Sequence, residues 1–250
     1  MRALIAAAWA GGALAAAGHG WTLSPPASGP AVDAPALASG DDWVYKDTTE
    51  RGTNWAEKTM QLDLERVNPD SLLVSTRESG STLPPKESLS GRDWSRFRSV
   101  NGVETVVNRP LEFPLTPGKH WDVDYTELNP NAGHKSEHFH TDYLVTGWED
   151  VDTPAGRFRA LKIEGDGRWS AILAPGAVAG ALARVGGGGA TTLTQSQAIT
   201  ARPISGRTYK LIYYAPQVKR WVKAVEEYYD VNGVRSERYT DTLQSYKVAG

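Results

Sequence analysis

The chain has 250 residues, a formal net charge of −2 and no cysteine. The missing thiols exclude disulfides, thiolate metal sites, cysteine nucleophiles and iron–sulfur clusters. The slightly acidic balance does not fit a nucleic-acid-binding protein, which needs a basic surface. With 40% hydrophobic and 22% charged residues, the composition is that of an ordinary globular protein. Its 9 Trp and 10 Tyr favour strands and aromatic-lined surfaces.

The first 17 residues have the three parts of a secretory signal peptide. Arg2 gives a positive start, an apolar run covers Ala3–Leu14, and Ala15–Ala17 supplies small residues for a peptidase. A helix over this segment would span about 22 Å, short of the roughly 30 Å hydrocarbon core of a bilayer. We therefore predict a signal peptide over residues 1–17 and export to the periplasm or the medium. The mature chain is expected to lack a transmembrane anchor.

A linker is predicted to follow the signal peptide. Residues 18–40 contain four prolines among Ala, Ser and Gly. Such a composition cannot bury enough apolar surface to become ordered. We therefore expect a disordered Pro/Ala linker over residues 18–40 and a single all-β domain over residues 41–250, a length that suits one β domain.

The part of the chain beyond residue 41 is dominated by apolar residues at every second position. This alternation occurs in the runs Met60–Leu64, Trp121–Tyr125, Phe139–Val145, Tyr209–Tyr213 and Trp221–Tyr229. It is typical of strands with one buried and one wet face. A sheet of about a dozen strands must twist and usually curls. The sequence predicts an all-β fold, a large curved antiparallel meander that forms a half-barrel or a barrel.

Turn-forming residues separate these strands. Asn101-Gly102 and Asn232-Gly233 each lie between valines and predict type I′ turns that join antiparallel hairpins. Pro154-Ala155-Gly156 predicts a further tight turn. The Ala/Gly-rich segment Ala171–Ala190 contains Gly186–Gly189, a run that would stop any helix. We expect a long insertion between two strands, either a disordered loop or an apolar flap over a cavity.

Three segments together resemble a domain-of-unknown-function family of exported bacterial β proteins. They contain a Pro-Leu-x-x-Gly-x-x-Trp strand start, a Pro-Ala-Gly-x-Phe turn and a Tyr-Ala-Pro-x-Val-x-x-x-Val-Lys strand pair, within Phe113–Trp121, Val145–Glu164 and Tyr213–Lys223. The resemblance implies an envelope protein without established chemistry. Some relatives look like the curved-sheet lipoprotein carriers, which hold acyl chains against a half-barrel. This chain departs from them by its insertion and by lacking a lipidated cysteine.

The main polar cluster is His134–Asp142. In a strand, His138, His140 and Asp142 point to one face, and positions two apart are about 6.6 Å from one another. This spacing lets two imidazoles reach one metal ion, with zinc or copper as the ions of choice. A solvated strand face is the alternative. Lys219, Arg220 and Lys223 are interpreted as charge on the wet face of edge strands, where lysine discourages aggregation; a contact with a lipid headgroup or an anionic partner is the alternative.

No catalytic motif is present. The chain lacks a Gly-x-Ser-x-Gly elbow, a His-Glu-x-x-His motif and a phosphate-binding loop. The sequence therefore favours a non-catalytic envelope protein over an enzyme. It would bind an apolar, lipid-like or amphipathic small molecule, or a partner protein, on a curved aromatic-lined sheet. An envelope hydrolase with carboxylate or His-assisted chemistry, and a His-cluster metal-binding protein, are the two alternatives.

Overall fold

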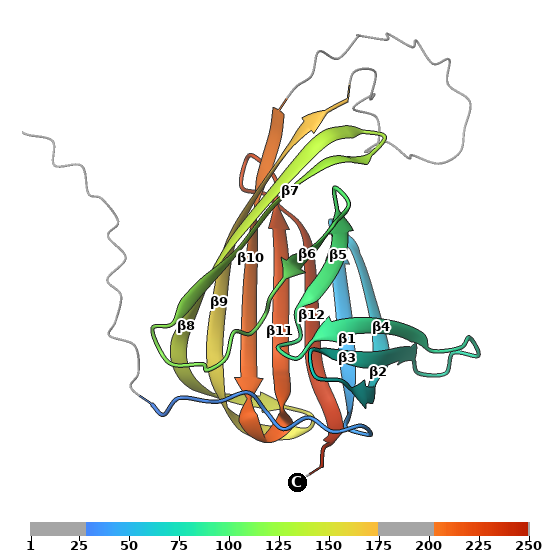
Figure 1. Cartoon of the computed structure of the whole chain (residues 1–250), viewed down its shortest axis with the longest axis vertical. Coiled ribbons are helices and arrows are strands. Elements are labelled where there is room, and N and C mark those ends of the chain that lie inside the picture. The colour runs from blue at the N-terminus through green and yellow to red at the C-terminus, as the bar shows by residue number, and fades with distance from the viewer. Residues whose placement is uncertain (1–28, 175–202, 250) are drawn as a thin grey trace, which may run out of the picture.

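The computed structural model describes residues 29–174 and 203–249. These residues form twelve strands and one short 3-10 turn, η1, and no α-helix (Figure 1). The elements are β1 (Asp42–Arg51), β2 (Asn54–Val67), β3 (Ser71–Glu78), β4 (Lys86–Gly91), β5 (Arg96–Val100), β6 (Val103–Asn108), β7 (His120–Asn131), β8 (His134–Thr153), β9 (Gly156–Leu173), β10 (Pro203–Ala215), η1 (Pro216–Val218), β11 (Arg220–Tyr229) and β12 (Arg235–Lys247). The predicted all-β class is confirmed.

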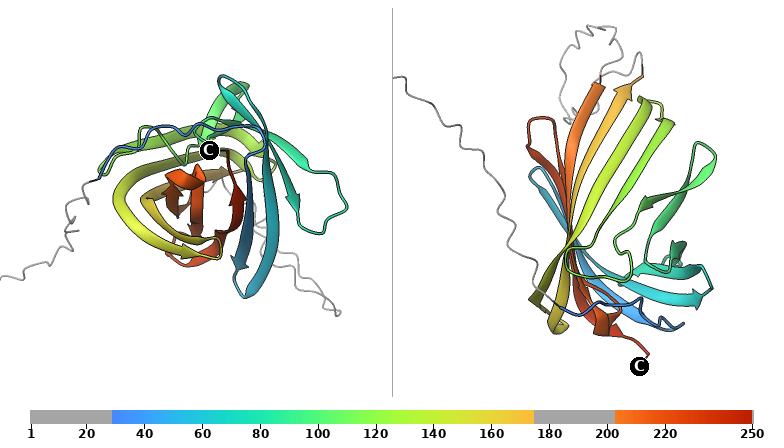
Figure 2. Two further views of the ribbon diagram at one scale, coloured as in Figure 1. Left: turned by 90° about the horizontal axis from the view of Figure 1, so that it is seen from below. Right: turned by 60° about the vertical axis from the view of Figure 1, so that its left-hand side comes forward.

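Ten of these strands form one antiparallel sheet in the order β4-β3-β2-β1-β12-β11-β10-β9-β8-β7. The sheet consists of two meanders, β1–β4 and β7–β12, which the pairing of β1 with β12 joins. Its end strands β4 and β7 do not pair with each other, so the sheet curls into an open half-barrel rather than a closed barrel (Figure 2). The remaining hairpin, β5–β6, contacts both end strands. The predicted curved meander is confirmed in its half-barrel form.

Both predicted Asn-Gly hairpins form, but their turns differ. Asn101 and Gly102 have φ angles of 51° and 83°, the positive values that a type I′ turn between β5 and β6 requires. The loop between β11 and β12 is longer. There the Asp230 carboxylate accepts hydrogen bonds from the backbone N–H groups of Asn232 and Val234, both at 2.9 Å. This side-chain cap replaces the predicted two-residue turn.

Residues 29–40 run as a strap across one end of the half-barrel, the lower end in Figure 1. Val32 forms an antiparallel bridge with Leu115, and Leu37 is buried in the core. The Lys219 ammonium donates to the carbonyls of Ala36 (2.7 Å) and Ala249 (2.6 Å) and so ties both ends of the domain together. The ordered domain therefore begins before residue 41, because backbone pairing orders a segment whose composition alone predicted a disordered linker.

Parts of the predicted domain plan lie outside the described residues. These parts are the signal peptide, residues 18–28 of the linker and residues 175–190 of the insertion. Residues 171–173, the start of the predicted insertion, belong to β9. No helix within residues 29–174 and 203–249 combines the length and the apolar composition needed to cross a membrane.

The hydrophobic core fills one end of the concave face. Trp43 on β1 is fully buried, donates its indole N–H to the Val218 carbonyl (2.8 Å) and packs edge-on against Trp94 at 5.3 Å. Leu111 and Leu115, from the segment that follows β6, cover this cluster and are also fully buried. The inward-facing residues of the period-two pattern thus form the predicted buried face at this end.

The curl of the sheet requires small residues on the inner face of β9. Gly167 lies between Thr141 on β8 and Thr208 on β10. A Cβ at this position would overlap the Thr208 hydroxyl and come within 2.9 Å of the Thr141 hydroxyl. Because threonine is β-branched, two of its three staggered χ1 rotamers place a heavy atom toward this position. Glycine is therefore the residue that lets β8 and β10 approach here.

Gly167→Ala is expected to destabilise the fold by about 1–3 kcal/mol, the usual cost of adding a methyl group to a filled site. Chemical denaturation followed by tryptophan fluorescence would measure this change. Ser170→Ala, three residues along β9 on its outer face, is the matched control and should leave stability almost unchanged. An equal stability of the two variants would contradict this account of the curvature.

Candidate functional site

The predicted metal residues lie together on the outer face of β7 and β8. His138 Nε2 and His140 Nδ1 both contact Asp124 Oδ2, at 3.0 and 2.9 Å. His140 Nε2 lies 3.0 Å from Asp142 Oδ2. Asp124 sits directly opposite His140 in the pairing of β7 with β8. The structure therefore brings His138, His140 and Asp142 close together, with Asp124 as an additional member from the neighbouring strand.

The hydrogen bonds of this cluster favour a protonated His140. Its contacts with Asp142 first, and with Asp124 second, raise the pKa of His140 above the ordinary value. Both ring nitrogens are then N–H donors to carboxylates. Within the described residues no group of three or more His, Asp or Glu side chains is arranged to hold a metal ion. Zinc or copper binding by His138, His140 and Asp142 stays a prediction that requires these hydrogen bonds to break.

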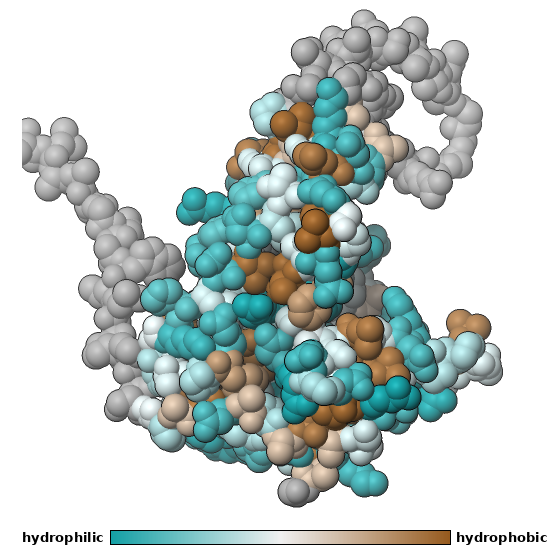
Figure 3. Space-filling view, viewed as in Figure 1, coloured by the Kyte–Doolittle hydropathy of each residue, from teal (hydrophilic) through white to brown (hydrophobic). Residues whose placement is uncertain are grey.

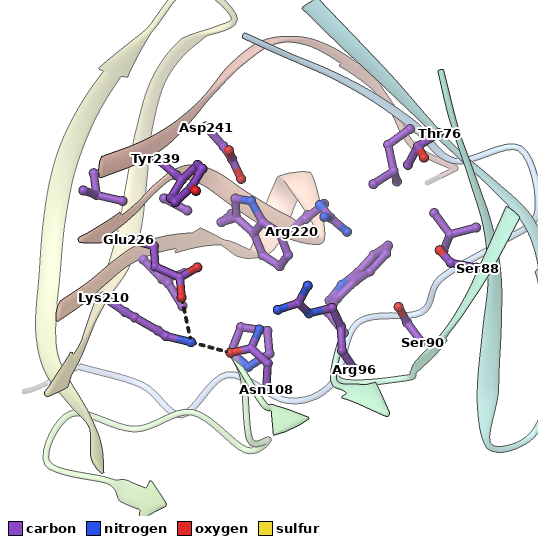
Figure 4. Close-up of a pocket in the computed structure, with 18 residues that line it drawn as sticks. Thr76, Ser88, Ser90, Arg96, Asn108, Lys210, Arg220, Glu226, Tyr239 and Asp241 are labelled. Carbon is purple, nitrogen blue, oxygen red and sulfur yellow. Dashed lines mark hydrogen bonds and ion pairs between the residues drawn. The ribbon is translucent and has the colours of Figure 1, made fainter. Parts of the chain in front are cut away.

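A cavity of about 410 Å³ opens on the concave face beside the core (Figure 4). It lies between the inner faces of β2–β4 and those of β10–β12, and residues of β5 and β6 contribute to its wall. Its apolar wall residues include Leu62, Val74, Trp94, Ile212 and Trp221. Its polar wall residues include Ser88, Ser90, Arg96, Asn108, Lys210 and Arg220. The cavity wall thus combines apolar side chains with polar and charged ones.

Arg220 is the central side chain of this cavity (Figure 4). It is only 7% exposed, and its guanidinium carbon lies 4.0 Å from the ring centroid of Trp94 and 3.7 Å from that of Trp221. This geometry gives cation–π contacts on two indoles. Burial lowers the pKa of the Arg220 guanidinium below its ordinary value. Its Nε and Nη1 atoms have no hydrogen-bond partner among the described residues.

A second charged group on the wall is internally paired. Lys210 Nζ lies 3.3 Å from Glu226 Oε1 and donates to Asn108 Oδ1 at 2.9 Å. The Tyr228 hydroxyl also donates to Glu226, at 2.9 Å. Burial alone would raise the pKa of Glu226, but Lys210 and Tyr228 hold it below its usual value. This network neutralises Lys210 and leaves Arg220 as the buried cation without an ion pair.

Two carboxylates face each other near Arg220. Asp47 on β1 is directly opposite Asp241 on β12, and Lys58 on β2 is its partner on the other side. Burial, and next the charge of Asp241, raise the pKa of Asp47 to about 7. Burial also raises the pKa of Asp241. Both groups therefore hold protons more tightly than free aspartates, which weakens the negative charge near Arg220.

The interpretation of Lys219, Arg220 and Lys223 as edge-strand charge is wrong for Arg220. β11 is an inner strand of the sheet, between β10 and β12. Arg220 shares its alternation with Val222, which is fully buried, and this parity is the signal that could have placed it inside. The cavity as a whole could not be found from the sequence, because its walls come from strands far apart in the chain.

Asp142→Asn is expected to lower the pKa of His140 toward that of a free imidazole, because the stronger of its two carboxylate contacts is lost. NMR titration of the histidine ring protons would measure the change. Asp152→Asn, ten residues further along β8, is the control and should leave the titration of His140 as it was. An unaltered titration in Asp142→Asn would contradict the hydrogen bond from His140.

Asp47→Asn is expected to stabilise the protein at pH 8 by about 1–2 kcal/mol, after allowance for solvent screening of a partly exposed group. The raised pKa means that the folded state keeps the Asp47 proton longer than the unfolded state. Its contribution to stability is full below about pH 4 and is lost as the pH rises to about 7.

The test is urea denaturation of both proteins at pH 4 and pH 8. Near pH 4 the two should differ little. Asp122→Asn, on the exposed outer face of β7, provides the control for a change of net charge. A difference between Asp47→Asn and the wild type that does not depend on pH would show that Asp47 is not held protonated.

No protein-family model and no curated protein matches the chain. A solved structure of a candidate lipoprotein from Parabacteroides distasonis is 16% identical, with a TM-score of 0.41 over 88% of this chain and 100% of that one. A candidate exported protein with a YmcC-like fold from Bacteroides fragilis is 13% identical, with a TM-score of 0.40 over 87% of this chain and 100% of that one. Likenesses this low carry no functional conclusion.

Proposed function

We propose that the protein is an exported, non-catalytic binding protein that holds an amphipathic small molecule in the cavity of its half-barrel. The observation that carries the proposal is the open cavity itself. The core fills only one end of the concave face, and about 410 Å³ beside it stays empty of protein atoms. This volume falls in the range of about 300–1,000 Å³ that is typical of small-molecule sites.

The walls of the cavity support an amphipathic ligand. Indole and aliphatic side chains lie beside arginine, serine and asparagine groups (Figure 4). The surface around the half-barrel is largely hydrophilic, with separate apolar patches (Figure 3). A wholly apolar ligand would leave the polar wall groups without partners, and such groups are costly to bury unpaired.

A second hollow extends the cavity. It has a volume of about 300 Å³ and shares Arg96, Lys210 and Glu226 with the first. Its wall includes the stacked pair Tyr125 and Phe139, whose ring centroids are 5.2 Å apart. The two hollows together suit an extended ligand better than a compact one.

Two further observations support an exported and a non-catalytic protein. The pattern of residues 1–17 is that of a signal peptide, which supports a periplasmic or secreted protein. No histidine of the described residues lines the cavity, so its Ser88 and Ser90 hydroxyls have no imidazole base beside them. A hydrolase with carboxylate chemistry, and binding of a partner protein, are the alternatives to the proposal.

The uncharged dye N-phenyl-1-naphthylamine is expected to bind the purified protein with a Kd on the order of 1–10 μM. Its fluorescence rises on transfer from water to an apolar site. Ala224→Trp, which places a large side chain in the cavity wall, should weaken binding by about tenfold or more, because it occupies ligand space.

Ser205→Trp is the matched control. Ser205 lies on the exposed face of β10, so the same indole is added outside the cavity and should leave dye binding unchanged. Circular dichroism would confirm that both variants are folded. A wild-type protein that takes up no dye, or equal binding by both variants, would contradict the proposed site.

A further inference from the structure

The unsatisfied groups at the cavity are all hydrogen-bond donors. Arg220 Nε and Nη1 are buried without partners among the described residues. The indole N–H of Trp221, which lies near Asp241, also has no partner of hydrogen-bonding geometry. Arginine and tryptophan side chains have no acceptor atoms. A ligand that satisfies these groups must therefore bring acceptors to this side of the cavity.

The charged side chains of the cavity wall also favour a ligand with acceptor groups. Arg96 and Arg220 both line the cavity, and neither forms an ion pair within the described residues. The third cation, Lys210, is already paired with Glu226 at 3.3 Å. Against these three cations the wall holds two acidic residues, Glu226 and Asp241, and burial raises the pKa of Asp241. The cavity thus carries an excess of positive charge.

The Arg220 side chain is held in place by its neighbours. Trp94 and Trp221 lie close to the guanidinium, with ring centroids 4.0 and 3.7 Å from its central carbon. The side chain is thereby fixed before any ligand arrives, so little of its rotamer freedom is lost on binding. Figure 4 shows the guanidinium of Arg220 within the cavity, with the Arg96 side chain nearby.

We propose that the ligand of this cavity is an amphipathic anion whose acid group accepts hydrogen bonds from Arg220, with Trp221 and Arg96 beside it. Carboxylate, sulfonate and phosphate groups all supply the required acceptors and charge. This inference rests on the proposed binding function, and it goes further by assigning the head group of the ligand and the residue that recognises it.

The test compares three probes with one decyl chain: decanoate, decanol and decyltrimethylammonium. The full-length mature protein is titrated with each probe, followed by tryptophan fluorescence and by calorimetry. Decanoate should bind about 10- to 100-fold more tightly than decanol, the range expected for a charged hydrogen bond in a buried site. The ammonium probe should bind more weakly than decanol, because its charge matches that of the wall.

Arg220→Gln should remove this preference, so that decanoate binds no better than decanol. Arg168→Gln makes the same chemical change on the exposed face of β9 and should keep the wild-type preference. If Arg220→Gln does not fold, the three probes on the wild-type protein still decide the head group.

The outcomes separate the two proposals. Equal binding of decanoate and decanol, or tighter binding of the ammonium probe, would overturn the anionic head group but leave the amphipathic binding function standing. A failure of all three probes to bind would remove the binding function and the head-group assignment together. A preference for decanoate that survives in a folded Arg220→Gln variant would overturn the role of Arg220.

Discussion

The whole architecture depends on the antiparallel pairing of the first strand with the last. β1 and β12 align from Asp42 opposite Lys247 to Arg51 opposite Glu237. Without this ladder the chain would form two separate meanders, each with an additional unpaired edge. With it, β1 and β12 become inner strands and Asp47 comes to lie opposite Asp241. The groups that surround the cavity are therefore assembled by a contact between residues almost two hundred positions apart.

The concave face of the half-barrel has a packed core at one end and an open cavity beside it. At one end, Trp43 and its neighbours are packed and hydrogen-bonded, as in an ordinary core. Beside it, the wall holds a buried guanidinium, a lysine–glutamate pair and Asp241, a carboxyl whose pKa is raised by burial. Buried charge opposes folding unless it is paired. The concentration of such groups around one opening is the pattern expected where local stability has been given up for recognition.

Local patterns in the sequence predicted the strands well. The period-two alternation identified the meander, and Asn101-Gly102 identified its hairpin, because both signals depend on residues close together in the chain. The pairing of β1 with β12 and the open edges have no comparable signal, since they depend on which distant strands meet. The strap over residues 29–40 was missed for a related reason: its order comes from Val32 pairing with Leu115, which composition cannot reveal.

The candidate sites also contain features that the local sequence predicts and features that depend on distant strands. His138 and His140 were correctly predicted to share a face, because strand alternation determines this, whereas their partner Asp124 depends on the register of β7 against β8. Arg220 was misinterpreted because its charge suggested an edge strand. In the structure, two tryptophans shield that charge, one of them its own neighbour in the chain.

The Lys219 side chain links this cavity to both ends of the folded domain. It holds the carbonyls of Ala36 and Ala249 and is the residue directly before Arg220. A force applied at either end of the domain, for example by a tether, would reach Lys219 before it reached most of the sheet. Lys219 thus connects both ends of the described domain with the strand that carries Arg220.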